Sequence, residues 1–261
     1  MADSGRKRLW ARRLTSVASA LSFGAVAAAL IGAVGSGQEL WHFRTGFSIL
    51  RYAFYAAAAG AVIALVGALL ARKAEPRLVR RCLAALVVAL AFLAFVGSQL
   101  RTARAAVPLH DITTNLTDIP GFHRLPVRAD NLERVPDLDQ PELAALPPLE
   151  RWKAVHREAY PDLRTVRVPW SVAETIARAE ALARERGWEV VTVDTGQGVL
   201  EAVETSRFFR FKDNVVVRAR PPAQGGSGTI VDMRSISRVG GSDVGVNAKR
   251  IRRFLADLKG D

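Results

Sequence analysis

Three long apolar runs, each without a charged residue, dominate the first hundred positions of the chain. They cover residues 14–34, 52–71 and 82–100, and are 21, 20 and 19 residues long. A helix of roughly 20 apolar residues crosses the hydrocarbon core of a bilayer. Three such runs in succession are typical of membrane proteins rather than of helices buried in a water-soluble fold. The pattern therefore predicts a membrane region over residues 1–106 with three transmembrane helices.

Beyond residue 164 the pattern changes to short amphipathic segments. Apolar positions at helical spacing predict a helix after Ser171, which forms a capping box with Glu174, and this helix should end at Gly187. Alternation with a period of two predicts strands at 165–168, 188–194, 199–205, 214–220 and 229–237, and a second apolar stripe predicts a helix over 246–258. Residues 165–261 should therefore form an α+β two-layer domain, an antiparallel sheet with two helices on one face, in the order β-α-β-β-β-β-α.

Between these two parts, residues 107–164 hold eight of the twelve prolines. Proline fixes φ and lacks a backbone donor, so long helices and central strands are disfavoured there. One short helix is expected over residues 149–159. We expect this segment, called the arm below, to be extended and to pack against the domain.

Basic residues flank the three runs in the alternation five, two, five, two. The two groups of five are Arg6, Lys7, Arg8, Arg12 and Arg13, and Arg72, Lys73, Arg77, Arg80 and Arg81. The positive-inside rule then places the N-terminus in the cytoplasm and everything after residue 100 on the other side. We expect an integral protein of the bacterial inner membrane with a periplasmic C-terminal domain. If the first run were a cleaved signal peptide, two spans would remain and the domain would keep its location.

Small residues recur every four positions in two of the runs, at Gly24, Ala28 and Gly32, and at Ala56, Gly60 and Ala64. This spacing lets helices approach closely, either within the chain or in a homo-oligomer. The three runs contain no Asp, Glu, Lys, Arg or His, which argues against a transporter because ion pathways usually need such groups.

The net charge of +12 does not indicate a nucleic-acid partner once it is divided along the chain. Residues before Val107 include 14 Lys/Arg and 3 Asp/Glu, whereas the rest includes 23 and 22. The domain is therefore close to neutral, and nucleic-acid binding needs a clustered basic face.

The single cysteine, Cys82, excludes an internal disulfide and lies in an apolar run, where it cannot serve as a nucleophile.

A glycine-rich turn precedes the last helix, in the stretch SRVGGSDVGVNAKRIRRFL. Gly240 and Gly245 have the separation of a phosphate-binding loop, but Val246 stands where that loop needs lysine. The structural interpretation is that Ser242 or Asp243 caps the helix, and the alternative is anion binding at the helix N-terminus with the help of Lys249.

Four landmarks give the chain a resemblance to a known family. HDITTN at 110–115, YPDL at 160–163, RFFRFKDNVVVR at 207–218 and VDMRSISRVGGSDVGVNAKRI at 231–251 occur in order. Over about residues 107–258 the chain resembles the DUF1499 family of uncharacterised proteins. The resemblance implies membrane-attached relatives and an α+β domain, but no reaction. Asp213-Asn214 stands where the family pattern has two acids.

Candidate binding residues are those that could converge on the charged face of the sheet and the loops at one end. They are His110, Asp111, Arg218, Asp232, Arg234, Arg238, Ser242, Asp243 and Asn247. A solvated face with weak ion pairs is the alternative. The run Arg207, Phe208, Phe209, Arg210, Phe211 and Lys212 could contact lipid headgroups or could continue a strand into a hairpin.

The residues around HDITTN also raise the question of a metal. His110, Asp111, Asp118 and His123 are suitable ligand types, but their spacing matches no standard site, so we expect neither a metal nor a cofactor.

The function class that follows is a membrane-tethered binding or scaffold module of the cell envelope, with the bilayer and an envelope protein or lipid as partners. The alternative is a hydrolase acting on envelope material through His110, Asp111 and Asp243, and contact between His110 and Asp243 would favour it.

Overall fold

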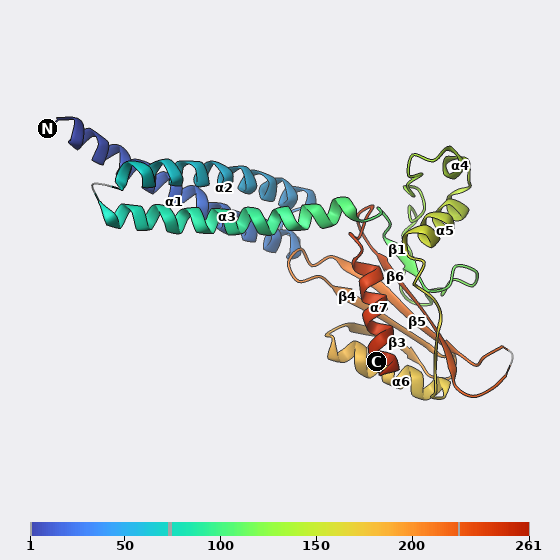
Figure 1. The fold of residues 1–261 in the computed structure, drawn as a ribbon. Helices are drawn as coiled ribbons and strands as arrows, with labels where there is room; N and C mark the ends of the chain where they lie inside the picture. Colours follow the sequence, from blue (N-terminus) through green and yellow to red (C-terminus); the bar gives the residue numbers. More distant parts are fainter. Residues whose placement is uncertain (1, 73–74, 224, 261) are drawn as a thin grey trace. The chain divides into compact units, whose positions relative to one another are not determined.

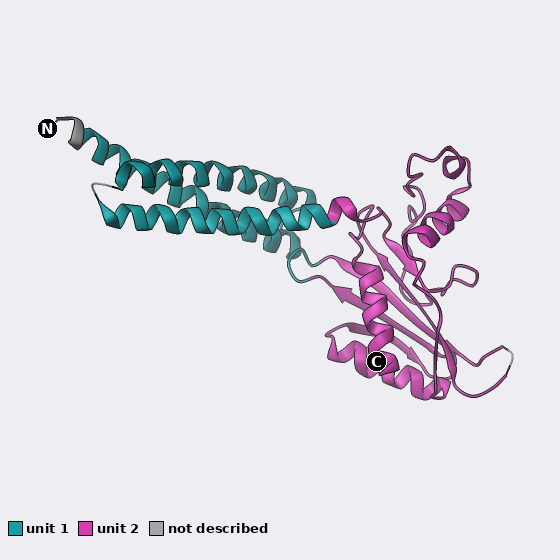
Figure 2. Ribbon diagram, viewed as in Figure 1, with its two compact units in different colours: residues 1–102, 207–210 teal, residues 103–206, 211–261 magenta. Residues whose placement is uncertain are grey.

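The computed structural model of the chain describes residues 2–72, 75–223 and 225–260. It divides into two compact units, 1–102 with 207–210 and 103–206 with 211–261 (Figure 2). Lys73, counted among the flanking charges, and residue 224 of the loop before the last strand lie outside the described residues.

Three long helices form the first unit: α1 (Ala2–Gly37), α2 (Phe43–Ala71) and α3 (Pro76–Ala105) (Figure 1). Each contains a stretch long and apolar enough to cross a membrane. The three predicted runs lie inside these helices, which extend beyond them into charged flanks. By length and composition, these three helices indicate a membrane protein.

Small residues let these helices approach one another. A Cβ on Gly60 would lie 2.8 Å from Ser22 Oγ, and one on Gly67 would lie 3.0 Å from Cys82 Sγ. Ala18, Ala64 and Ala85 form one buried cluster. The stripe at residues 56–64 thus serves packing within the chain. In the other stripe Gly32 is buried against Ile49, whereas Gly24 is exposed.

The second unit contains an antiparallel sheet, as the alternation of its sequence predicts. After β2 (Val166–Val168) and α6 (Val172–Glu185) come β3 (Glu189–Asp194), β4 (Val199–Thr205), β5 (Lys212–Arg220), β6 (Thr229–Ser237) and α7 (Val246–Lys259). The strand order is β1-β6-β5-β4-β3, with β2 also paired to β6. The predicted order β-α-β-β-β-β-α is confirmed.

The arm adds structure that its prolines did not suggest. Its residues Asp111–Thr113 form β1, which pairs with Arg234–Ile236 of β6. It also carries α4 (Pro141–Ala144) and α5 (Pro148–Ala159), the second of which is the expected helix. Because β1 is only three residues long, its pairing depends on the strand that receives it rather than on its own pattern.

Both long helices of the second unit cover the same face of the sheet (Figure 1). Ile176 of α6 and Ile251 and Phe254 of α7 are fully buried against Val217 and Met233 of the sheet. The capping box of α6 is present, because Ser171 Oγ accepts a hydrogen bond from the Glu174 amide at 3.2 Å. Side chains from the sheet and from both helices form one buried apolar cluster between the two layers.

Candidate functional site

The arm covers the other face of the sheet. The alternative of a solvated face with weak ion pairs is therefore wrong. Glu201 of β4 is fully buried there, and its carboxylate accepts hydrogen bonds from the backbone amides of three consecutive arm residues. These are His123, Arg124 at 3.0 Å and Leu125 at 2.8 Å. A buried carboxylate is tolerated only with such donors, so Glu201 fixes the path of the arm.

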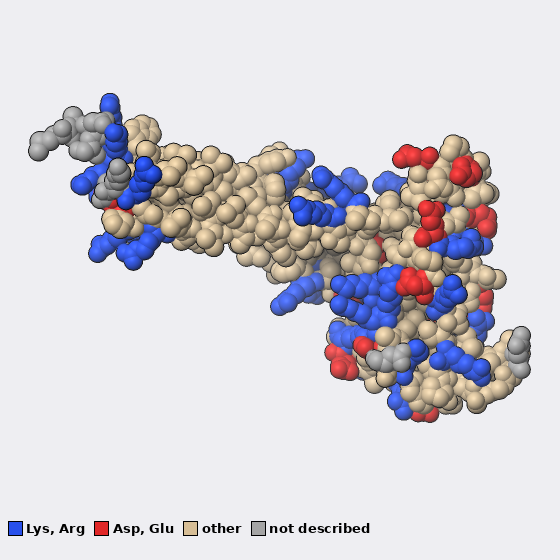
Figure 3. Space-filling model, in the orientation of Figure 1, with Lys and Arg blue, Asp and Glu red and all other residues tan. Residues whose placement is uncertain are grey.

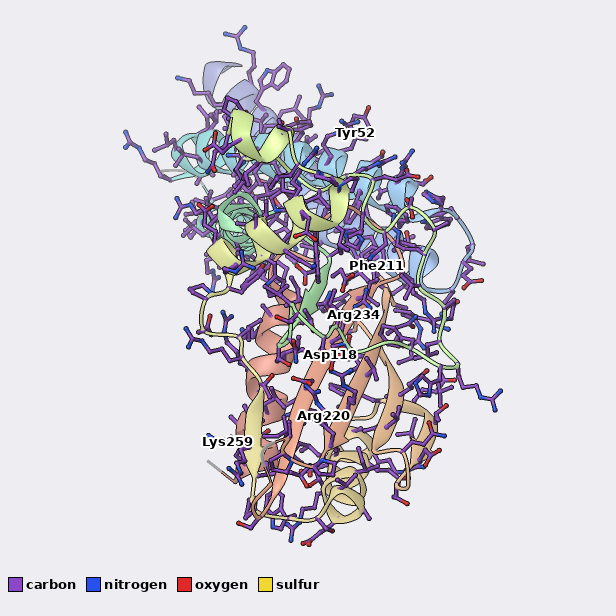
Figure 4. The ribbon with its side chains drawn as sticks, turned by 90° about the vertical axis from the view of Figure 1, so that its right-hand side faces the viewer. Tyr52, Asp118, Phe211, Arg220, Arg234 and Lys259 are labelled. Carbon is purple, nitrogen blue, oxygen red and sulfur yellow. The ribbon has the colours of Figure 1, made fainter. Side chains whose placement is uncertain are left out.

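Asp232 of β6 is the centre of a second cluster on this face. It has no exposed surface, and its Oδ2 accepts from Arg218 Nη2 at 2.9 Å and Arg220 Nη2 at 2.8 Å. Asp118 of the arm bridges the same two arginines, and Figure 4 shows Asp118 and Arg220 on the same side of the sheet. The hydrogen bond from Arg218 lowers the pKa of Asp118. Thr165 Oγ1 also donates to Asp232.

Asp111, Arg234 and His110 meet in a third cluster. Arg234 donates to Asp111 through Nε at 2.8 Å and Nη2 at 2.6 Å, a bidentate pair. Asn131 links this pair to the ring, since its Nδ2 donates to Asp111 at 2.6 Å and its Oδ1 lies 3.0 Å from His110 Nε2. Burial lowers the pKa of His110, and the Gly241 backbone hydrogen-bonds its side chain. The His110 side chain is therefore a buried member of this polar cluster.

Asn247 joins the helix side of the sheet to the arm. Its Nδ2 donates to the His110 carbonyl at 3.0 Å and Ser237 Oγ at 3.1 Å, and its Oδ1 accepts from Ser235 at 2.7 Å. The same Oδ1 accepts from buried Arg250, which also forms ion pairs with Glu204 and Asp213.

The glycine-rich turn is a helix start, but its N-cap residue is Gly245, with φ +77°, and not Ser242 or Asp243 as the structural interpretation predicted. Asp243 Oδ1 accepts from the Gly245 amide at 2.7 Å and Oδ2 from the Asn247 amide at 2.8 Å. Ser242 Oγ accepts from the Val244 amide at 3.1 Å. Burial raises the pKa of Asp243 to about 6, against the effect of its two amide donors.

The candidate residues therefore belong to separate clusters instead of converging on one site. Arg238 stands apart again, donating to Asn214 Oδ1 at 2.7 Å. The arm does reach the closing turn, because the Asp243 amide donates to the Leu109 carbonyl at 3.0 Å. The side chains of His110 and Asp243, however, have different partners. Within residues 2–72, 75–223 and 225–260, no group of three His, Cys, Asp or Glu is placed to hold a metal ion.

The run from Arg207 to Lys212 is a turn followed by the start of β5. Phe208 is 52% exposed, and the ring of Phe209 lies 4.8 Å from that of Phe47 of α2, between centroids. Residues 207–210 cluster with the three helices, while Lys212 belongs to the sheet. Strand and turn are thus both present.

A surface groove of about 590 Å³ lies beside α7 and was not expected from the sequence. Its cationic side chains are Arg186, Lys249, Arg250 and Arg253. Its remaining lining is Trp188, Val246, Glu204 and Asp257. We call it the basic groove. The only sequence signal was the pair Lys249 and Arg253, four residues apart on one helix.

Comparison with known proteins supports the resemblance of the four landmarks. A search of the curated proteins finds no match to the chain. A family model described as protein of unknown function (DUF1499) matches residues 111–258. This match covers the whole sheet from β1 onward and both helices that lie on it, which is more than half of the chain. The chain belongs to the DUF1499 family.

Proposed function

We propose that this protein is a membrane-anchored binding module of the cell envelope, which holds its DUF1499 domain on the periplasmic side of a bacterial inner membrane. The observation that carries the proposal is the basic groove, a charged depression on the surface of the domain. Concave sites with a few convergent polar groups are where proteins bind small ligands.

The polar clusters support binding rather than hydrolysis. A general base or nucleophile must be able to reach substrate, but His110 is tied to Asn131 and Asp111 to Arg234. Asp243 uses both carboxylate oxygens to accept the backbone amides of Gly245 and Asn247 at the start of α7. The residues suggested for a hydrolase are thus engaged in holding the arm and the helix in place.

The location rests on the charges that flank the helices. Five basic residues precede the first apolar run and five lie between the second and third, against two in each of the other flanks. Lys and Arg are retained on the cytoplasmic side of a membrane. Three spans with the N-terminus inside leave the domain outside.

Fusion of alkaline phosphatase after Asp261 tests this location, because that enzyme matures only outside the cytoplasm. We expect an active phosphatase at this position and an inactive one when the fusion follows Glu75, with green fluorescent protein giving the reverse pattern. Fluorescence from the fusion after Asp261 would overturn the proposed location.

A further inference from the structure

We propose that the basic groove binds a phosphate group, carried either by the headgroup of an anionic lipid or by a free phosphate compound. This inference rests on the proposed function, since it names the ligand class of that binding module. It concerns residues of α7, of the connection between α6 and β3, and of the end of β4, none of which belongs to the clusters of the arm-covered face.

Two of the four cations in the groove are held by internal ion pairs. Arg250 is bound between Glu204 and Asp213, at 2.5 and 2.7 Å. Arg186 pairs with Asp257. These pairs fix the positions of the arginines and use the acids of the groove, so neither acid is left to repel an incoming anion.

Lys249 and Arg253 supply the remaining positive charge. They are exposed and one turn apart on α7, and neither has a side-chain hydrogen bond or ion pair within the part of the chain that the structure describes. Figure 3 shows basic side chains gathered over α7. Two adjacent cations with free donors can share the oxygens of one phosphate, and charge-assisted hydrogen bonds of this kind are the strong ones.

Two aromatic side chains, Trp188 and Phe254, lie next to these cations. Trp188 stacks on Phe254 with ring centroids 5.1 Å apart and an angle of 13° between the planes, and the Arg186 guanidinium lies over both rings. Val246 is 49% exposed at the groove. The two rings are buried and hold Arg186 in place, while the exposed Val246 beside the cations suits a ligand with a charged head and an apolar body.

The groove lies at the end of the sheet that is joined to the membrane helices. Trp188 immediately precedes β3, whose first residue, Glu189, pairs with Val203 near the end of β4. At this same end β1 pairs with Ile236, and only residues 106–110 separate β1 from α3. A short tether of this kind favours a ligand presented by the membrane surface.

Lysine footprinting on the full chain tests the proposal directly at the groove. The protein is placed in nanodiscs of phosphatidylcholine alone or with one quarter phosphatidylglycerol, and the rate at which an acetylating reagent modifies Lys249 is measured by mass spectrometry. Lys153 of α5, paired with Glu150, serves as the internal reference. We expect phosphatidylglycerol to slow modification of Lys249 about fivefold by occupying the groove, while Lys153 is unchanged.

Inorganic phosphate added to the phosphatidylcholine discs separates the two sources of the ligand. Protection of Lys249 by inorganic phosphate identifies a free phosphate compound, and protection by phosphatidylglycerol alone identifies a lipid headgroup. Lys249 that reacts equally fast under all three conditions would overturn the proposal.

A matched pair of variants distinguishes the groove from general attraction to negative charge. Arg253→Gln removes a groove cation, and Arg157→Gln removes an exposed cation from α5. We expect protection of Lys249 to be lost in Arg253→Gln and kept in Arg157→Gln; equal loss in both would also overturn the site. The fusion experiment reports location independently, so a groove that binds phosphate in a cytoplasmic domain would reject the location and keep the site.

Discussion

Three carboxylates on the arm side of the second unit have almost no exposed surface: Asp111, Glu201 and Asp232. An ionised carboxylate in such a place is costly unless its oxygens accept several hydrogen bonds. Asp111 accepts from Arg234, and Glu201 accepts from three backbone amides. Asp232 accepts from the pair Arg218 and Arg220. Asp111 and Asp232, which were candidate binding residues, and Glu201, which was not, thus attach the arm to the sheet.

At the same scale, His156 of α5 makes stability depend on pH. Its Nε2 accepts a hydrogen bond from the Thr113 amide at 3.1 Å, and burial lowers its pKa from 6.5 to about 4. The unfolded chain therefore binds the proton first, so this contribution is complete above pH 6.5 and is lost as the pH falls towards 4. The loss amounts to about 3 kcal/mol.

The variant His156→Gln isolates this effect. Urea unfolding of the full chain in detergent, followed by tryptophan fluorescence, should show a smaller decrease in unfolding free energy from pH 7 to pH 5 for the variant than for the wild type. Asp243 titrates in the same range with the opposite sign, because burial raises its pKa to about 6, and it is common to both proteins. Equal pH dependence in both would contradict the role given to His156.

At the scale of elements, the turn between β3 and β4 depends on one glycine. Gly198 has φ +68°, and a Cβ there would lie 2.0 Å from the Ala219 carbonyl oxygen of β5. The Ala219 amide also donates to the Gly198 carbonyl at 2.7 Å, so the backbones cannot separate without losing a bond. The turn therefore requires glycine both for its conformation and for the close approach.

Gly198→Ala should lower the free energy of unfolding by about 2 kcal/mol or more, from strain and steric overlap together. Gly196→Ala in the same turn is the control, since its Cβ would meet only Asp194 Oδ1 at 3.4 Å and its φ is not in the left-handed region. The urea assay compares the two. Similar losses for both variants would show that the turn does not constrain β4 as described.

At the scale of the whole molecule, the boundary in net charge near residue 106 nearly coincides with the boundary between the two compact units. The first 106 residues carry a net charge of +11, and the domain that follows is nearly neutral. The second unit has a continuous core of its own, built from the sheet, α5, α6 and α7. Such a unit has what a domain needs to fold alone.

We therefore expect residues 103–261 to form a soluble monomer that unfolds cooperatively, as checked by size exclusion and thermal circular dichroism. Phe208 and Phe209, which belong to the helix unit, would be the apolar residues through which copies of this fragment could associate. If the fragment aggregates, the double variant Phe208→Ser/Phe209→Ser should restore a monomer. A fragment that lacks a cooperative transition in both forms would refute independent folding.

The local pattern of the sequence determined most of the elements. The bounds of β4 and β6, the Ser171 cap and the three long helices follow from periodicity, capping chemistry and runs of uncharged residues. These signals are local, because burial of one face repeats within a few positions. The same alternation placed the charged candidates Arg218, Asp232 and Arg234 on strands, but as a binding face and not as buried groups.

Only the tertiary structure decided what those residues do. The pairing of Asp111 with Ile236 joins segments 125 positions apart, and no local period can encode a partner at that distance. The same pairing brings the arm over the outer face and converts its expected binding residues into internal ion pairs. The basic groove likewise exists only because α7 lies beside Trp188, which precedes β3, and Glu204 of β4, residues that are distant from α7 in the sequence.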